Sequence, residues 1–305
     1  MKKIPLLLAG LILGIFGLSN LLLSYHPFLQ TSLAVLASFL WILYTWSLFY
    51  HLKTYWQEIQ ATTLFTSCAP YPMSTMLLAA YLHQLGWNKL ALIIWCYGGV
   101  LDLAMVLYCS LYLIPRQDRL EVTPSWTVLY VGIAMIGLTN QVSGATLLGW
   151  FSIALGLILT LLLTPFILRG LPRLPSPLRP QVAILCAPFS LLLAASIRMA
   201  GPHLPQTSLY ALMLASQLFY FLALAKIPHA LKNGFYPSYS ALTFPLVISA
   251  TSWKMSLPLA GLNYHLLTQI LLKFEETLAV LIVTFVSLHY FFYLRKNWRK
   301  QEEKN

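Results

Sequence analysis

Five residues that disturb regular helices recur in this sequence, about one every 57 residues and each inside an apolar segment: Gly14, Pro72, Gly132, Pro188 and Pro245. A proline within a helix removes one backbone hydrogen bond, and in lipid the freed carbonyl group needs a partner in protein or water. A glycine lets a helix bend and lets another surface approach closely. Five kinked segments alternating with five straight ones therefore indicate a pore.

The repeat extends beyond these single residues, because Pro124, Pro180 and Pro237 each lie eight positions before one of them. Proline is tolerated at a helix start, where its missing N–H would have no partner in any case. The segments "TPSWTVLYVG", "RPQVAILCAP" and "YPSYSALTFP" align without gaps. This doubled pattern argues that the spacing is a structural repeat and not a chance result of 18 prolines.

The elements that position these residues must span a membrane. Of the 305 residues, 59% are hydrophobic and only 9% are charged, and the mean hydropathy is +0.73. A span needs roughly 20 apolar residues. We predict an all-α integral membrane protein in a single transmembrane domain, 1–305, with spans at Pro5–Ser24, Phe28–Leu52, Cys68–Leu85, Leu90–Ile114, Ser125–Leu138, Leu147–Leu168, Val182–Ala200, Leu209–Ile227, Ser238–Trp253 and Glu276–Leu294.

The placement of lysine and arginine orients these ten spans. Only Lys89 and Lys254 fall clearly on one side, and the positive-inside rule then makes both termini cytoplasmic. The net charge of +11 follows from this topology, so we expect membrane lipid and no nucleic acid as a partner. We place the protein in a bacterial inner membrane. The basic residues on the other side are Lys2, Lys3, Lys53, Arg116, Arg119, Arg169, Arg173, Arg179, Lys226, Lys232, Arg295, Lys296, Arg299, Lys300 and Lys304.

Titratable side chains are scarce within the kinked segments, where a pump or an enzyme would need them. Arg198 could line an outer vestibule or extend to the lipid headgroups. Asp102 lies in a straight span. Its two candidate roles are a hydrogen-bonding partner between helices and a proton relay. Lys273, Glu275 and Glu276 precede the last span and form a predicted cluster at the outer interface, with a contact between subunits as one use.

Catalysis and cofactor binding have no support in the sequence. We find no Walker-type glycine loop, no aspartate-rich prenyl diphosphate motif and no GxSxG nucleophile. No close spacing of histidines and cysteines supports a metal site. We therefore expect no enzyme activity, no metal and no cofactor.

Four segments carry a resemblance to a known family: "PYPMSTMLLA" in the third span, "TPSWTVLYVGI" in the fifth, "RPQVAILCAPFSLLLAA" in the seventh and "FYPSYSALTFPLVISA" in the ninth. They resemble the tellurite-resistance/dicarboxylate transporter family, which includes bacterial TehA-type proteins, malate carriers, sulfite exporters and plant slow anion channels. The resemblance covers nearly the whole chain. Ser240 and Phe189 depart from the usual pattern, which weakens any transfer of substrate preference.

The resemblance implies five helical hairpins in a quasi-fivefold arrangement, with odd-numbered helices lining a central pore and even-numbered helices outside. It also implies a homotrimer with one pore in each protomer. A phenylalanine on the ninth helix closes the family's pore, and by motif position this is Phe244 here. Phe189 and Arg198 are further candidates for the pore wall or its vestibule.

We predict an anion channel for small inorganic or organic anions, in which Phe244 is a steric and dewetting gate. Conduction requires that a bound ion can leave its site, and a neutral pore lining holds an anion weakly enough for this. One alternative is a proton-coupled carrier of malate, other C4-dicarboxylates or sulfite. Another is a drug/metabolite-type transporter, although its two inverted halves fit a 57-residue period poorly.

Overall fold

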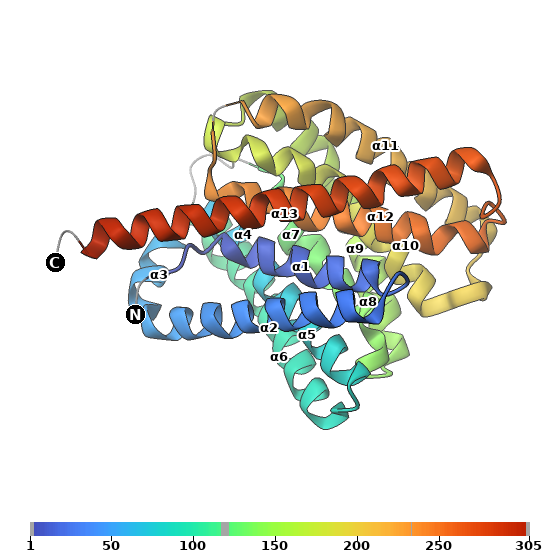
Figure 1. Ribbon diagram of the computed structural model, residues 1–305, viewed down its shortest axis with the longest axis horizontal. Helices are drawn as coiled ribbons and strands as arrows, with labels where there is room; N and C mark the ends of the chain where they lie inside the picture. Colours follow the sequence, from blue (N-terminus) through green and yellow to red (C-terminus); the bar gives the residue numbers. More distant parts are fainter. Residues whose placement is uncertain (1–2, 117–121, 233, 303–305) are drawn as a thin grey trace.

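A computed structural model describes residues 3–116, 122–232 and 234–302, and every regular element in these ranges is a helix. Lys2, Arg119, Arg299, Lys300 and Lys304, which were used to orient the chain, fall outside the described residues or side chains. Figure 1 shows α13 (Leu266–Glu302) running along the longest dimension of the molecule beside α1. The described chain begins and ends toward the same end of this dimension.

Five segments form the interior, because almost every residue along them is buried. Three of them combine different helix types in one apolar stretch. The five are α1 (Leu8–Leu22), α5 (Pro70–Gln84), α7 (Ser125–Val131) joined to α8 (Met135–Leu138) by a 3₁₀ turn at Gly132–Ala134, α10 (Ala187–Ala200) preceded by the 3₁₀ segment Ser176–Cys186, and α12 (Thr243–Leu259) preceded by the 3₁₀ segment Pro237–Leu242.

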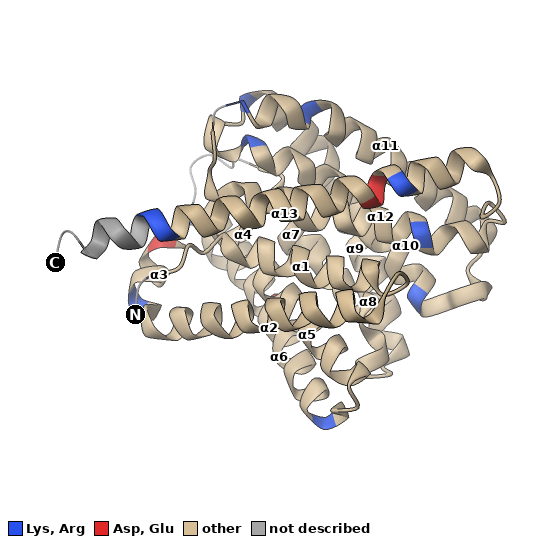
Figure 2. Cartoon of the chain, viewed as in Figure 1, with Lys and Arg blue, Asp and Glu red and all other residues tan. Residues whose placement is uncertain are grey.

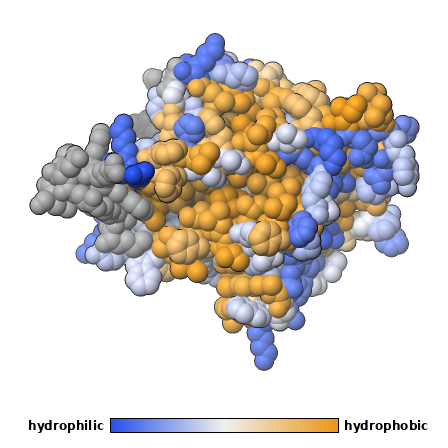
Figure 3. Space-filling model, in the orientation of Figure 1, coloured by the Kyte–Doolittle hydropathy of each residue, from blue (hydrophilic) through white to orange (hydrophobic). Residues whose placement is uncertain are grey.

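Five longer helices cover this interior and expose large apolar side chains over much of their surface. Figure 3 shows the result as a broad hydrophobic surface over the middle of the molecule. Such a surface suits lipid and would be unfavourable in water. The helices are α2 (Pro27–Tyr50), α6 (Asn88–Tyr108, continued by a π turn at Cys109–Leu113 and a 3₁₀ turn at Ile114–Arg116), α9 (Thr146–Gly170, with a 3₁₀ turn at Leu171–Arg173), α11 (Gln206–Ala230) and α13.

The short elements lie in the connections: α3 (Leu52–Glu58), α4 (Thr62–Thr66), and 3₁₀ turns at Asn140–Val142 and Gly201–His203. The interior segments contact one another in a closed order. Helix α1 contacts α5 and α12, α12 contacts α10, α10 contacts α8, and α8 contacts α5. Each exposed helix also packs against the interior segment that precedes it in the chain. A space shared by all five interior segments would therefore lie in the centre of this order.

Six helices of the described chain are long and apolar enough to cross a membrane, and Leu8–Leu22 and Ser125–Leu138 are shorter apolar ones. The most buried of the six covers Ser176–His203, where 83% of the apolar window is buried, against 22–33% in the other five. Both shorter helices belong to the interior: Leu8–Leu22 is one uninterrupted α-helix, and Ser125–Leu138 changes helix type at Gly132. Together with the apolar surface, these helices indicate an integral membrane protein.

On the face shown in Figure 2, most charged residues lie toward the ends of the helices, apart from an acidic and a basic band within α13. Helix α13 begins ten residues before the predicted start of the last span, so Lys273 and Glu276 lie inside it. Glu276 contacts Lys254 of α12 at 2.6 Å and Lys273 at 3.2 Å, and Tyr25 hydrogen-bonds to both Glu276 and Lys273. Lys273 and Glu276 of the predicted cluster are therefore paired, and their bonds lie within one chain.

Glu275, the third predicted member, is fully buried and makes no ion pair with any described residue, so it does not belong to this cluster. Partial burial and the hydrogen bond to Glu276 raise the pKa of the Tyr25 phenol, which stays protonated at neutral pH. At the opposite end of the chain's interior helices, Lys3 pairs with Glu58 of α3.

Glu276→Gln is expected to destabilise the protein by about 1–3 kcal/mol, because it leaves the partly buried Lys254 without its counter-ion. Glu58→Gln removes the same charge from the more exposed pair with Lys3 and should cost less than about 1 kcal/mol. Thermal unfolding of both variants in detergent measures the difference. Equal shifts in midpoint would show that the Glu276 cluster adds nothing beyond an ordinary surface pair.

Candidate functional site

A cavity of about 50 Å³ lies at the centre of the interior segments and receives residues from all five of them. We call it the inner cavity. It has room for a few water molecules, since one needs roughly 10–15 Å³. Its lining includes Gly10 and Leu13 near the start of α1, Pro70 and Met73 of α5, Val128 and Gly132 of the α7 segment, Gln181 and Pro188 of the α10 segment, and Ser240 and Phe244 of the α12 segment.

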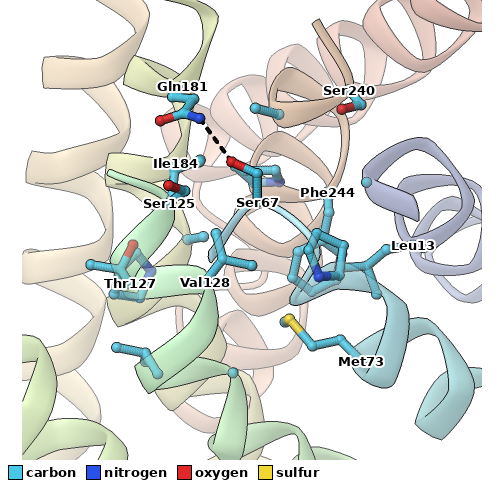
Figure 4. Close-up of a pocket in the computed structure, with 18 of the residues that line it drawn as sticks. Leu13, Ser67, Met73, Ser125, Thr127, Val128, Gln181, Ile184, Ser240 and Phe244 are labelled. Carbon is cyan, nitrogen blue, oxygen red and sulfur yellow. Dashed lines mark hydrogen bonds between the residues drawn. The ribbon is translucent and has the colours of Figure 1, made fainter. Parts of the chain in front are cut away.

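The inner cavity has a polar side and an apolar side (Figure 4). Gln181 donates from Nε2 to Ser67 Oγ at 3.1 Å, and both side chains lie toward the same edge as Ser240. Leu13 and Met73 lie on the other side beside the ring of Phe244. A solute that crosses the cavity from its polar to its apolar side would therefore pass from hydroxyl and amide groups to the ring of Phe244.

A second cavity of about 60 Å³, the outer cavity, lies toward the other ends of the same segments. Its lining comes from Gly17 and Asn20 of α1, Leu77 and Gln84 of α5, Leu138, Thr139 and Gln141 at the end of α8, Arg198 of α10, and Val247, Thr251 and Met255 of α12. Phe244 lines this cavity as well as the inner one. Phe244 is only 5% exposed. Because it lines both cavities, it lies between the two spaces.

Close packing of α12 on α1 fixes the position of Phe244. The single hydroxyl proton of Thr243 is shared between Gly10 O, 2.9 Å from Oγ1, and Ser240 O, 2.7 Å from Oγ1, and the contact with Gly10 ties the start of α12 to α1. A Cβ atom at Gly17 would lie 3.4 Å from Phe244 Cδ2. The absence of a side chain there lets the phenylalanine ring lie against the α1 backbone.

The five residues predicted as kinks have other local roles. Pro72, Pro188 and Pro245 lie in the first turns of α5, α10 and α12, where a missing N–H breaks no helical hydrogen bond. The prediction of prolines in mid-helix was therefore wrong in detail. The prolines mark where a new α-helix starts within one apolar stretch.

The two glycines also differ from each other. Helix α1 is uninterrupted at Gly14, where an added Cβ atom would lie 2.4 Å from Thr243 Oγ1, so this glycine allows close packing and makes no kink. Gly132 does mark a break, because the chain changes there from α7 to a 3₁₀ turn. Gly132, Pro188 and Pro245 line the inner cavity, whereas Gly14 and Pro72 are not among its lining residues.

Phe189 does not line either cavity. Its ring packs against Phe219 of α11, with 5.0 Å between the ring centroids, on the side of α10 away from the inner cavity. One residue is enough to turn a side chain by about 100° around a helix. The suggestion that Phe189 belongs to the pore wall is corrected accordingly, while Arg198 does line the outer cavity.

Sequence reasoning gave too little weight to Asp102. Its carboxyl group is fully buried, and neither oxygen has a hydrogen-bond partner among the described residues, so it is not the predicted partner between helices. Its Oδ1 lies 3.6 Å from where a Cβ atom of Gly132 would be. The spacing of Ala91, Trp95, Gly98 and Asp102 marks the buried face of α6 and could have revealed this orientation.

A family model described as "voltage-dependent anion channel" (SLAC1) matches residues 3–294 of this chain. The match spans nearly the whole length, and the chain belongs to this family. Membership identifies an integral membrane protein of an anion channel and transporter family. A search of curated proteins found no match.

Proposed function

We propose that this protein is an anion channel whose pore runs through the inner and outer cavities and is closed by Phe244. One observation carries the proposal: each cavity is lined from all five interior segments, and Phe244 lines both. The apolar aromatic side chain of Phe244 therefore lies between the two spaces. Rotation of that side chain would open a continuous path and re-admit water.

The proposed architecture has ten spans in five hairpins, arranged with quasi-fivefold symmetry in one domain, 1–305. The closed order of contacts among α1, α5, α8, α10 and α12 supports it. So does the packing of each exposed helix on the interior segment before it. In this proposal the interior segments are the odd-numbered spans and form the pore wall.

The electrostatics of the inner cavity favour a weakly bound anion. No carboxylate is among its described lining residues. The first turn of α5 contributes Pro70 to the lining, so the positive end of this helix dipole lies toward the cavity. Hydroxyl and amide groups are neutral, but their hydrogens carry partial positive charge. They attract an anion weakly enough for it to leave again.

The surroundings of the pore are also proposals. Basic residues near the end where α13 finishes support cytoplasmic termini in a bacterial inner membrane. The apolar faces of α2, α6, α9, α11 and α13 would contact lipid or, in a homotrimer, neighbouring subunits. Cysteine labelling from either side and mass measurement of the detergent-solubilised protein test orientation and stoichiometry.

Reversal potentials of the purified protein in planar bilayers test the function. With asymmetric chloride, nitrate or malate, the reversal potential should follow the anion gradient and stay unchanged when a proton gradient is added. A channel dissipates only the gradient of the ion that it conducts. A reversal potential that moves with the proton gradient would show that the protein is a proton-coupled carrier and not a channel.

One observation favours that carrier as a second candidate. Asp102 places a buried, unpartnered carboxyl group directly behind Gly132 in the wall of the inner cavity. Buried ionisable groups within membranes commonly serve proton transfer. If the proton gradient does shift the reversal potential, Asp102→Asn should abolish the shift, whereas Glu58→Gln, remote in an exposed ion pair, should preserve it.

A further inference from the structure

Glu275 of α13 carries a fully buried carboxyl group that the proposed channel does not use. Neither of its oxygens has a hydrogen-bond partner among the described residues. The next residue, Glu276, pairs with both Lys254 and Lys273, so these lysines are already occupied. A carboxylate buried without a counter-charge is strongly unfavourable. Glu275 therefore needs a partner that the described part of the chain does not supply.

Two side chains of α11 lie beside this carboxyl group and also lack partners. The amide group of Gln217 approaches Glu275 but stays outside hydrogen-bond geometry, and both of its polar atoms are buried and unbonded within the described ranges. Tyr220 is fully buried, and its hydroxyl lies within electrostatic range of Glu275 without a hydrogen bond to any described residue. Buried polar groups are nearly always bonded. Three neighbouring ones that do not bond one another indicate an occupant between them.

These three side chains, which we call the α11–α13 site, lie deep in the apolar layer. Helices α11 and α13 start at the same end of the molecule, because Tyr210 near the start of α11 donates to Ala260 O, six residues before α13 begins. Glu275 and Gln217 are each roughly 15 Å along their helices, at 1.5 Å per residue. This is about half the thickness of the hydrocarbon layer. Water is therefore scarce around the site.

The α11–α13 site is separate from the two cavities. None of its three residues is among the lining residues of either one. Cys186, which ends the 3₁₀ segment before α10, lies within electrostatic range of Glu275, but its thiol already donates to Ala183 O at 2.9 Å. A ligand at this site would lie behind the pore wall, and its binding does not depend on anion conduction.

The available oxygen atoms define the class of ligand. Glu275 offers two carboxylate oxygens, Tyr220 offers a phenol oxygen, and Gln217 offers a carbonyl oxygen when its amide group turns that end toward them. Oxygen atoms are the ligands of hard cations. One positive charge balances the carboxylate, whereas a divalent ion would leave a net charge in an apolar interior. A proton on Glu275 would form a hydrogen bond with Gln217, and these two side chains form none.

We propose that the α11–α13 site binds a monovalent metal cation, such as Na⁺, through the side-chain oxygens of Glu275, Gln217 and Tyr220. The ion neutralises the buried carboxylate and joins α13 to α11. Sodium-coupled membrane proteins also hold their ions near the middle of the bilayer, where protein oxygens replace water. The site adds a cation to a protein whose proposed pore conducts anions.

Binding of radioactive sodium to the full-length protein in detergent tests the site, at constant chloride with N-methyl-D-glucamine as the replacement cation. We expect saturable binding and a higher thermal midpoint in sodium than in N-methyl-D-glucamine, because a ligand that binds only the folded state stabilises it. Glu275→Gln should abolish both effects. Tyr220→Phe removes one oxygen and keeps the ring, so it should raise the half-saturating sodium concentration by about tenfold.

Glu58→Gln is the matched control, because it makes the same substitution at an exposed carboxylate paired with Lys3. Asp102→Asn tests the other buried carboxyl group without a partner among the described residues. Sodium binding should persist in both variants. Its loss in Asp102→Asn alone would place the ion elsewhere and overturn the site.

Two results with the unchanged protein would also overturn the proposal: no saturable sodium binding, or a thermal midpoint that depends on pH and not on sodium, which would identify a proton as the ligand of Glu275. Equal sodium binding by Glu275→Gln and the unchanged protein would do the same. If Glu275→Gln does not elute as a single species, Tyr220→Phe decides. An unchanged half-saturating concentration in that variant contradicts the site.

Discussion

Phe244→Ala is expected to raise anion conductance through the purified protein by about tenfold or more. The ring is 5% exposed and lines both cavities, so its removal joins them into one space. A tenfold rise needs a barrier lower by only about 1.4 kcal/mol, which is small beside the cost of pushing an anion past a desolvated apolar constriction. Single-channel recording in planar bilayers measures the change.

Phe189→Ala provides the matched control. It makes the same substitution on a buried ring that packs against Phe219 and lines neither cavity. Both variants lose core packing worth about 3–5 kcal/mol, so conductance is compared only for protein that elutes as a single species. A conductance increase in Phe189→Ala equal to that in Phe244→Ala would mean that loosened packing, and not removal of a gate, opens the path.

Gly14→Ala is expected to destabilise the protein by about 1–3 kcal/mol or more, through overpacking. The added Cβ atom would lie 2.4 Å from Thr243 Oγ1 and 2.5 Å from Thr243 Cβ. Thr243 cannot easily rotate away, because its one hydroxyl proton is shared between Gly10 O and Ser240 O. Helix α12 must instead move away from α1, which also displaces Phe244. Thermal unfolding in detergent measures the loss.

Gly99→Ala is the matched control on α6, where the nearest atom to an added Cβ is Ile136 Cδ1 at 4.0 Å. There the gain in helix propensity, about 1 kcal/mol, has no packing cost to oppose it. The double variant Gly14→Ala with Thr243→Gly removes the side chain that the added methyl group would meet and should recover part of the lost stability. If Gly14→Ala is as stable as Gly99→Ala, then α1 and α12 do not contact as closely as described.

The sequence predicted the interior segments well because burial in lipid-spanning proteins leaves a compositional mark. All five apolar stretches built around Gly14, Pro72, Gly132, Pro188 and Pro245 lie in the interior. The local conformation was predicted less well. Pro188 begins an α-helix after a 3₁₀ segment, and the same backbone rule, a missing N–H, fits a kink and a helix start equally.

The site itself needed knowledge of helix rotation. Phe244 and Phe189 each adjoin the proline of a similar motif, yet one lines both cavities and the other packs against α11. Asp102 was assigned to a straight outer helix, and its helix is indeed exposed, but its own face is turned inward toward Gly132. Composition describes a segment as a whole and cannot report which of its sides meets a neighbour.

By itself, the sequence determined that the protein lies in a membrane and repeats a buried segment five times, because transfer of side chains into lipid depends on residue type and on the length of an apolar run. The tertiary structure alone decided which side chains surround the two cavities. Those positions depend on contacts between residues far apart in the chain, such as Gly14 with Thr243 and Lys254 with Glu276, which fix the rotation and depth of each helix against the next.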